Sequence, residues 1–363
     1  MADGRSPVAN YPSPVLILGI ETSCDETGCS LVRDGRDVLS NVIASQDALH
    51  EEYGGVVPEI ASRAHVERMI PVVRRALADG GASLDDVDAI AVGNRPGLIG
   101  SLLVGVSCAK ALAWSLGTPL IGVDHVAAHL YAGCLENDVP PMPALGLVVS
   151  GGHTSLYHCA SLIDIRRIGS TIDDAVGEAY DKGATILGLE YPGGPRLDRL
   201  AQTGNAHAHD LPISRLDPES LDFSYSGLKT ALLYKVRGAP ERDPVTNEVG
   251  FPRDHTDLSE AARADLAASF QRAAIGAVTL KINRALERRS DCRTLLVGGG
   301  VSANSFLRTE VQRLSAERNL ELRLPKMRYC LDNAAMIAGY AFHLHSARGA
   351  DDLSLRAVPT TAC

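Results

Sequence analysis

Two histidines, His125 and His129, stand four residues apart, directly after an apolar, strand-like run at 119–123. If this segment is helical, positions i and i+4 lie on one face, so both imidazoles point the same way. Imidazole nitrogens are common metal ligands, and the spacing favours a metal site; two histidines packed in a core are the alternative. A metal needs further ligands. Asp332, before the last predicted helix, could supply a carboxylate or simply cap that helix.

The histidine pair differs from the zinc-protease motif at one position. That motif has a glutamate directly after its first histidine, whereas Val126 stands there in this chain. The pair therefore lacks the general base that such proteases use, which counts against a metallopeptidase.

Three glycine- or hydroxyl-rich turns each follow a strand-like run, at 22–28, 150–155 and 298–304. Glycine lets the backbone approach phosphate oxygens closely, with N–H groups pointing at the anion. None of the three has the Walker sequence or the dinucleotide G-x-G-x-x-G pattern. Each alone is typical of an ordinary strand-end turn, but together they predict a phosphate and nucleoside site divided between two lobes.

An acidic segment follows the second of these turns. Asp174, Glu178 and Asp181 are predicted to share one face of a helix, which is also the pattern of a solvated helix face. The glycine turn at 192–195 either fixes the backbone near a ligand or ends that helix.

Apolar periodicity predicts alternating strands and helices, with helices at 62–79 and 102–116, which is typical of an α/β protein. A strand–turn–strand pattern near the N-terminus recurs at the second turn, which suggests two similar lobes. We expect the following organisation: a flexible extension at 1–14, an N-terminal lobe at 15–143, a C-terminal lobe at 144–329 with a surface insertion at 238–260, a helix at 330–348 that returns to the N-terminal lobe, and a tail at 349–363.

The composition is that of a globular protein, with 45% hydrophobic and 22% charged residues among 363. We expect no contact with a membrane, because no run of about 18 apolar residues occurs. Residues 1–14 lack the apolar middle of a signal peptide, and the eight cysteines form no C-x-x-C pair; both features favour a cytoplasmic protein with reduced thiols.

The net charge of −9 argues against binding nucleic acid by bulk electrostatics. Basic residues gather only locally: Arg284, Arg288 and Arg289 on one predicted helix, and Arg323, Lys326 and Arg328 near Asp332. They predict either two solvated faces or a basic rim that a partner completes.

Nine motifs, in order, cover about residues 15 to 345 and resemble those of the tRNA N6-adenosine threonylcarbamoyltransferase family, bacterial TsaD and archaeal–eukaryotic Kae type. They are GIETSCDET at 19–27, YGGVVPE at 53–59, HVAAH at 125–129, VSGGHT at 149–154, DK at 181–182, YPGGP at 191–195, FSYSGLK at 223–229, GGVSAN at 299–304 and DN at 332–333.

The resemblance implies an actin-like ATPase (ASKHA) fold with two similar lobes around a nucleotide cleft. It implies one divalent metal, usually iron in this family with zinc as the alternative, on the positions His125, His129 and Asp332. It places Asp25 and Glu26 in the family's acidic first loop, as candidate catalytic residues. The positions that match adenylate contacts are Val148, Val149, Ser150, Gly151, Gly152, Asp181, Gly194 and Asn304.

The implied reaction transfers a threonylcarbamoyl group from threonylcarbamoyl-adenylate to N6 of adenosine 37 in tRNAs that read codons beginning with A. The implied partners are tRNA, a paralogous subunit and a small ATPase. A glycoprotease-like metallopeptidase, a non-catalytic partner subunit and a sugar kinase of the same fold are the alternatives. The intact histidine pair argues against a degenerate partner, and no clear kinase aspartate is present.

Two features depart from the family pattern. Arg95 stands before Pro96-Gly97-Leu98, where the family usually has glycine, and it would add a cation or change the turn. The 238–260 segment looks longer than in bacterial members, which affects the expected partner surface more than the chemistry.

Overall fold

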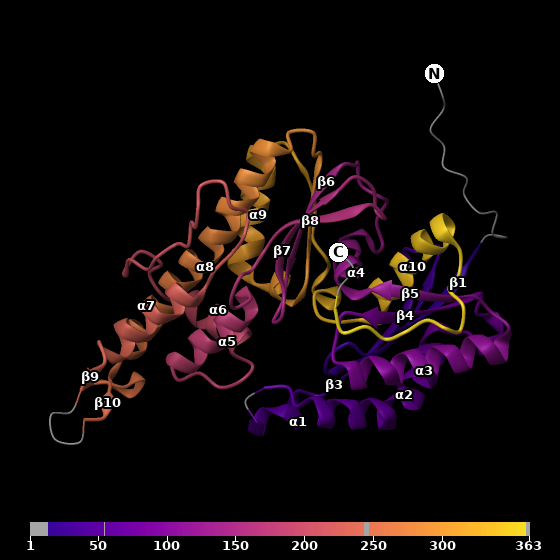
Figure 1. The fold of residues 1–363 in the computed structure, drawn as a ribbon, viewed down its shortest axis with the longest axis horizontal. Coiled ribbons are helices and arrows are strands. Elements are labelled where there is room, and N and C mark those ends of the chain that lie inside the picture. The colour runs from indigo at the N-terminus through magenta and orange to yellow at the C-terminus, as the bar shows by residue number, and fades with distance from the viewer. Residues whose placement is uncertain (1–13, 54, 243–246, 361–363) are drawn as a thin grey trace.

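Two five-stranded mixed sheets form the frame of the protein, and the computed structural model describes them within residues 14–53, 55–242 and 247–360 (Figure 1). The first sheet has the order β3-β2-β1-β4-β5, and the second has the order β12-β11-β6-β7-β8. In each, three antiparallel strands are followed by two strands parallel to the first of them. The predicted duplication is therefore confirmed: the two lobes share one topology.

Most of the strands are buried apolar runs, whereas β3, β8 and β12 at the sheet edges are partly exposed. Those of the first sheet are β1 (Leu16–Glu21), β2 (Glu26–Arg33), β3 (Asp37–Ser45), β4 (Ala89–Arg95) and β5 (Leu120–Asp124). Those of the second are β6 (Ala144–Val149), β7 (Thr154–Cys159), β8 (Ile165–Ser170), β11 (Thr294–Gly298) and β12 (Glu321–Arg323).

Helices surround both sheets, and their ends follow from local sequence. They are α1 (Asp47–His50), α2 (Pro58–Gly80), α3 (Ile99–Leu116), α4 (His125–Tyr131), α5 (Val176–Ile186), α6 (Gly193–Ala201), α7 (Ser226–Arg237), α8 (Glu260–Arg288), α9 (Ser305–Glu317) and α10 (Ala334–Arg348). Helix α2 begins one turn before the predicted start, because Pro58 occupies its first turn, and Gly81 ends it in the left-handed conformation.

One sequence expectation is wrong. Helix α5 begins at Val176, so Asp174 does not share a helical face with Glu178 and Asp181. Asp174 instead accepts hydrogen bonds from two lysines, Lys182 at 2.7 Å and Lys229 at 3.0 Å. The neighbouring Asp173 binds the hydroxyls of Ser224 and Ser226. These bonds hold the 223–229 motif at the start of α7, and they give that motif a structural role.

The 238–260 segment contains a short hairpin, β9 (Glu241–Arg242) with β10 (Val249–Gly250), whose residues are exposed. Residues 243–246 lie outside the described part, as do 1–13 of the expected N-terminal extension and 361–363 of the expected tail. The described part of the segment lies on the surface, at the far end of α7 and α8 (Figure 1).

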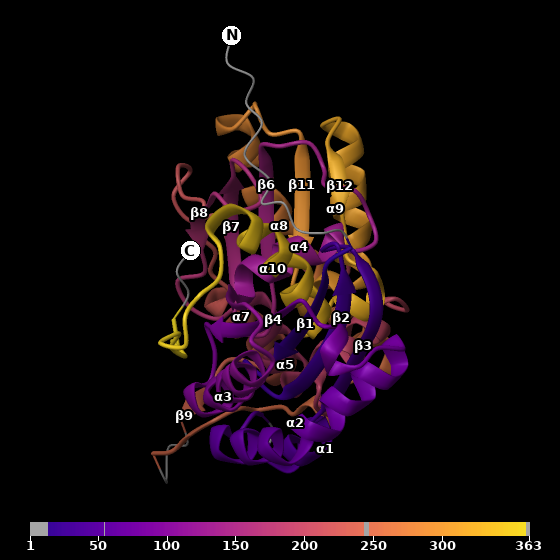
Figure 2. The same cartoon turned by 90° about the vertical axis from the view of Figure 1, so that its right-hand side faces the viewer.

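Helices α4 and α10 lie between the two sheets, as Figure 2 shows. Helix α10 packs on β1, β2, β4 and β5 of the first sheet, whereas α4 contacts β5 of the first and β6 and β11 of the second. Their buried side chains belong to one apolar core that includes residues of both sheets, such as Ile17 and Val148. Helix α4, which begins with His125, is therefore fixed at the junction of the lobes.

Among the described residues, α3 is the one helix long and apolar enough to cross a membrane by length and composition, and 33% of it is buried inside the fold. A single such helix is weak evidence, since core helices of soluble proteins pass the same test. Its buried side packs on β4 and α2.

The contact between the first sheet and α10 leaves no room for a side chain at Gly19. A Cβ atom there would lie 2.4 Å from the carbonyl oxygen of Ala334. We expect Gly19→Ala to lower the free energy of unfolding by about 1–3 kcal/mol, the usual cost of overpacking, seen as a lower urea midpoint. Gly227→Ala, where a Cβ would meet nothing within 4 Å, is the control and should not lower the midpoint, since alanine favours the helix more than glycine does. Equal midpoints for the two variants would contradict the expectation.

Candidate metal centre and nucleotide site

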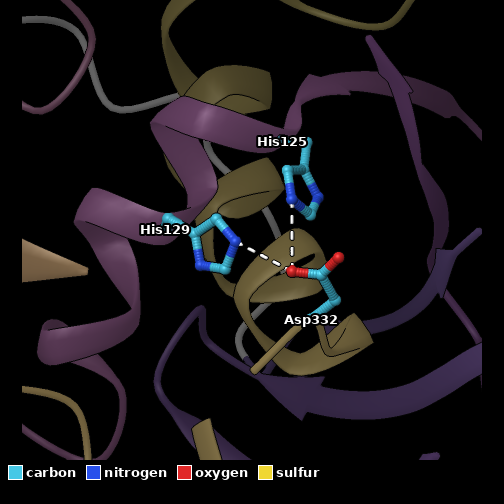
Figure 3. Close-up of side chains that lie close together, drawn as sticks. All are labelled: His125, His129 and Asp332. Carbon is cyan, nitrogen blue, oxygen red and sulfur yellow. Dashed lines mark hydrogen bonds and ion pairs between the residues drawn. The ribbon is translucent and has the colours of Figure 1, made fainter. Parts of the chain in front are cut away.

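Both α4 histidines contact the carboxylate of Asp332 through the same oxygen (Figure 3). The His129 Nε2 atom lies 3.0 Å from Asp332 Oδ1, and the His125 Nε2 atom lies 3.4 Å from it. The two imidazole rings meet edge to face, with their centroids 4.5 Å apart. The structure thus brings together the three residues that the sequence pattern singled out, from α4 and from the segment before α10.

The alternative role of Asp332 as a helix cap is wrong. The next residue, Asn333, caps α10, and its Oδ1 atom accepts a hydrogen bond from the Met336 N–H at 3.0 Å. Asn333 also donates to the backbone carbonyl oxygens of Tyr329 and Leu331. These bonds fix the backbone beside Asp332 and leave its carboxylate to the histidines.

A second layer of polar groups orients the imidazole of His125. Its Nδ1 atom lies 3.0 Å from Glu21 Oε2 and 3.2 Å from the hydroxyl of Ser23. Glu21 is the last residue of β1 and is fully buried. A carboxylate on Nδ1 keeps the proton there, so Nε2 is the nitrogen left for a metal. On His129, the buried Nδ1 atom has no hydrogen-bond partner in the described structure.

Burial and neighbouring charges divide the protons within this cluster. Burial disfavours a charged His125, but the carboxylates of Glu21 and Asp332 outweigh it and raise the pKa of His125 well above its ordinary value. Burial, followed by the charge on His125, lowers the pKa of His129. Although burial opposes ionisation of Asp332, the imidazoles hold the pKa of that carboxyl well below its ordinary range.

The residues fit a divalent metal ion. The ligand atoms of His125, His129 and Asp332 all lie within 4.8 Å of one another, and two imidazoles with one carboxylate form a donor set that other proteins use for iron(II). The same donors also suit zinc. A metal would take the place of the shared proton between histidine and carboxylate, because ligands must lose their protons to bind.

The acidic loop lies beside these three residues. One carboxylate oxygen each from Asp25, Glu26 and Asp47 lies within 4.8 Å of the others. Burial, and then the charges of Asp332 and Asp25, raise the pKa of Glu26 to about 10. The effect of Asp332 on Glu26 means that the loop and the metal ligands share one electrostatic environment.

The second glycine turn reaches the same place through His153. Val148 and Val149 end β6. The Ser150 N–H donates to the His153 carbonyl oxygen at 2.8 Å, and the Ser150 hydroxyl oxygen accepts from the His153 N–H at 3.0 Å. Burial, and then the charges of His125 and His129, lower the pKa of His153 to about 4. A Cβ atom on either of the next two glycines would meet nothing within 4 Å, so Gly151 and Gly152 face open space that a ligand could occupy.

Two glycines of the third turn, at 298–304, pack against the backbones of α4 and β6. A Cβ at Gly298 would lie 2.0 Å from the carbonyl oxygen of His129, and one at Gly299 would lie 2.4 Å from that of Val149. Gly299 also has a φ of 90°, which favours glycine. Only glycine therefore allows the backbones of α4, β6 and this turn to approach so closely.

Three more of the predicted adenylate contacts form a separate group in the C-terminal lobe. Asp181 Oδ1 accepts hydrogen bonds from the N–H groups of Gly193 and Gly194, each at 3.0 Å. Asn304 caps α9 through its Oδ1 atom and donates to Gln271 Oε1 at 2.9 Å. The polar atoms of Asp181 and Asn304 thus shape the backbone around any ligand. Gly194 faces open space, because a Cβ atom there would meet nothing within 4 Å.

Tyr191 is partly buried at the start of the glycine turn at 191–195. Burial, and then the carboxylates of Asp25 and Asp181, raise the pKa of Tyr191 to about 12. Its phenol therefore stays protonated at neutral pH.

Glu21 and His153 are the site residues that the sequence argument did not select. Both lie within quoted motifs, the first in GIETSCDET and the second in VSGGHT. Their spacing from His125 carries no helical or strand periodicity, so only the fold shows that they surround the histidine pair.

We expect His125→Ala and Asp332→Ala each to remove bound metal, because each deletes one of three ligands in a buried site. Elemental analysis of the purified variants should show loss of the metal found in the wild-type protein. Far-UV circular dichroism should remain that of the wild type, since α4 and α10 keep their own caps. As a control, His343→Ala removes a histidine of α10 that contacts Tyr131 instead of Asp332. Full metal occupancy in the two ligand variants would refute the assignment.

Solved structures match the fold at low sequence identity. HypF from T. kodakarensis aligns with 93% of this chain and 49% of its own length, at a TM-score of 0.59 and 15% identity. The activator of the 2-hydroxyisocaproyl-CoA dehydratase from Clostridium difficile aligns over 93% and 99%, at a TM-score of 0.51 and 13% identity. These likenesses support the expected actin-like ATPase fold.

Family and sequence comparisons agree with one another. The family model described as tRNA N6-adenosine threonylcarbamoyltransferase matches residues 37–339. A protein of that name from Moorella thermoacetica is 48% identical over 343 residues, which cover 94% of this chain and 96% of the relative. Another from Trichlorobacter lovleyi is 50% identical over 347 residues, with 95% and 96% coverage. The chain therefore belongs to the tRNA N6-adenosine threonylcarbamoyltransferase family, whose members are transferases that modify tRNA.

Proposed function

We propose that this enzyme transfers threonylcarbamoyl from threonylcarbamoyl-adenylate to N6 of adenosine 37, in tRNAs that read codons beginning with A. The observation that carries the proposal is the close packing at Gly298 and Gly299, which brings the helix of the His125–His129–Asp332 ligand set next to the end of β6 and its 150–153 turn. A metal-ligand set beside an open glycine turn suits an acyl donor that bears a phosphate.

The reaction forms one bond and breaks one. The N6 amine attacks the carbamoyl carbon, a C–N bond forms, and the bond from that carbon to the phosphate oxygen breaks, so that AMP leaves. The amine is a weak nucleophile because its lone pair is delocalised into the ring, whereas the mixed anhydride is already activated. Positioning of the two substrates and stabilisation of negative charge are therefore the main tasks of the protein.

The proposed roles follow from where each group lies. Amides of Gly151 and Gly152 hold the adenylate phosphate, Ser150 fixes the shape of the turn through its bonds with His153, and Val148 and Val149 are the strand residues of β6 that lead into it. Asp181 and Asn304 shape the backbone around the nucleoside, and Gly194 contacts it. A bound metal, which we propose to be iron(II) with zinc as the alternative, would polarise anionic oxygens of the donor.

The proton that leaves N6 needs an acceptor, and the acidic loop supports one. Burial and neighbouring carboxylates raise the pKa of Glu26 to about 10, so Glu26 keeps its proton at neutral pH, with a carboxylate oxygen of Asp25 within 4.8 Å. Of the two, we assign proton acceptance to the Asp25 carboxylate and donation of a hydrogen bond to Glu26. The family match favours this transferase over the metallopeptidase, the sugar kinase and the non-catalytic subunit. Modification of tRNA fits a cytoplasmic enzyme.

A reconstituted reaction with the synthase, the paralogous subunit and the small ATPase tests the function. We expect mass spectrometry of digested tRNA to show threonylcarbamoyl-adenosine with the wild-type chain. His129→Ala and Asp25→Asn should each lower the rate at least about 100-fold, the scale of losing a group that acts in the transition state. The exposed Arg75→Ala, on the outer side of α2, is the control. Wild-type chain with no product would overturn the proposal.

Most of the cations expected to form a basic rim are bound by other groups of the protein. Lys326 and Arg328 both contact Glu136, and Arg323 lies 2.6 Å from Glu321. On α8, Arg284 donates to three backbone carbonyls and Arg288 pairs with Glu219. These pairs lower the local positive charge, which supports the proposal that the paralogous subunit and the small ATPase complete the tRNA surface.

The salt dependence of tRNA binding measures how many phosphates the rim contacts. Each contact steepens the fall of log affinity with log salt by about 0.7 to 0.9. If Arg323 and Arg328 both contact phosphates, reversing them to Glu should flatten the slope by about 1.4 to 1.8 units. Reversal of Arg75 and Arg313 to Glu changes the net charge equally and is the control. Arg75 pairs with Asp79 on α2, and Arg313 pairs with Glu317 on α9. An unchanged slope with full transfer would show that tRNA binds elsewhere, most simply on the partner.

A further inference from the structure

One buried histidine of α2 forms hydrogen bonds with the acidic loop between β1 and β2. The His65 Nε2 atom lies 3.0 Å from the carbonyl oxygen of Cys24, and its Nδ1 atom lies 2.8 Å from the hydroxyl of Thr27. His65 and Thr27 are both fully buried. The two residues that His65 binds flank Asp25 and Glu26, so a single ring holds both ends of the loop.

The hydrogen bonds determine the tautomer of His65. A carbonyl oxygen only accepts, so Nε2 carries the proton and donates to Cys24. Burial lowers the pKa of His65, which favours the neutral ring. In that ring Nδ1 has no proton, and it accepts from the Thr27 hydroxyl.

Buried polar side chains pack beside this ring. The Val57 N–H donates to His50 Nδ1 at 3.3 Å, and His50 Nε2 lies 3.3 Å from Gln46 Oε1. The amide nitrogen of Gln46 donates to the Ala61 carbonyl at 3.4 Å and lies 3.5 Å from both ring nitrogens of His65. Gln46 therefore limits the space in which the His65 ring can move, while Cys24 and Thr27 make its shorter hydrogen bonds.

Backbone anchors also lie on both sides of Cys24 and Asp25. The Leu98 N–H donates to the Ser23 carbonyl oxygen at 2.8 Å, on the side that faces α3, and Glu26 and Thr27 pair with Ser45 and Ala44 of β3. Without His65, those anchors would still hold Ser23 and the start of β2, while the Cys24 carbonyl and the Thr27 hydroxyl would lose their partner. A buried polar group without a partner costs about 1–3 kcal/mol, enough to let Cys24 and Asp25, which lie between the anchors, move.

We propose that His65 is a positioning residue, which holds Asp25 and Glu26 in place beside the metal ligands by bonding the residues on both sides of them, with Gln46 packed against its ring. The proposal rests on the proposed role of the acidic pair in transfer. It assigns function to a histidine that touches neither the metal ligands nor the expected substrates.

Two His65 variants and one partner variant test this role. His65→Leu removes both bonds, whereas His65→Gln keeps an amide that can donate to the Cys24 carbonyl. Thr27→Val removes the other bond and preserves the shape of the side chain. We expect kcat to fall about 10- to 100-fold in His65→Leu with KM changed less than about threefold, the scale of a misplaced reacting group. His65→Gln should restore most of kcat, and metal occupancy should stay at the wild-type level in all three.

A readout independent of activity comes from Cys24, which lies in the loop and is partly buried. A loosened loop should expose this thiol, so its alkylation by iodoacetamide, followed by peptide mass spectrometry, should accelerate at least about tenfold in His65→Leu and less in His65→Gln. Cys108 on α3, also partly buried, is the internal reference and should not change.

The outcomes separate the two proposals. Should the wild-type chain fail to modify tRNA, the proposed function falls, while the Cys24 rates still decide whether His65 fixes the loop. Unchanged Cys24 alkylation and unchanged kcat in His65→Leu and Thr27→Val would overturn the positioning role. Equal acceleration at Cys24 and Cys108 would also overturn it, because general loosening of the lobe would then explain the loss.

Discussion

One carboxylate oxygen shared by two imidazoles is the contact on which the site depends. Asp332 Oδ1 meets the Nε2 atoms of His129 at 3.0 Å and His125 at 3.4 Å, in a place where both rings are buried. An unpaired charge is costly there, so each charged group must have a partner, and Glu21 completes the balance behind His125. A divalent ion would satisfy the same groups, which makes this cluster suitable both for folding without metal and for binding one.

The rest of the fold serves to bring α4, α10 and the three turns to this point. Helix α4 is short, but it packs on strands of both sheets. Its two histidines are therefore held in place by both lobes. Gly298 and Gly299 permit the closest approaches, against the carbonyl oxygens of His129 and Val149. The turn that ends β11 therefore ties the metal helix to the turn that ends β6.

The sequence predicted what depends on local pattern. The spacing of His125 and His129, the duplicated strand–turn–strand units and the buried runs of β1 and β6 are local features, and the structure confirms them. Glu21 lies 104 residues before His125, and His65 lies 41 residues after Cys24. Contacts at such separations follow from the pairing of strands and helices, which periodicity alone does not reveal. The acidic face predicted for α5 failed for a related reason: Asp174 meets Lys229, 55 residues away, in place of its helical neighbours.

Charge pairing also explains how an acidic protein can act on tRNA without binding nucleic acid indiscriminately. The net charge is −9, and the basic residues near Asp332 share Glu136 and Glu321. A phosphate backbone must compete with those carboxylates, so binding by the isolated chain gains little from counterion release. Partner subunits that add cations beside this surface would raise affinity only where the complex is assembled. If partners assemble as proposed, the negative charge of the chain would weaken its binding to RNA in general, and only the assembled complex would bind its substrate well.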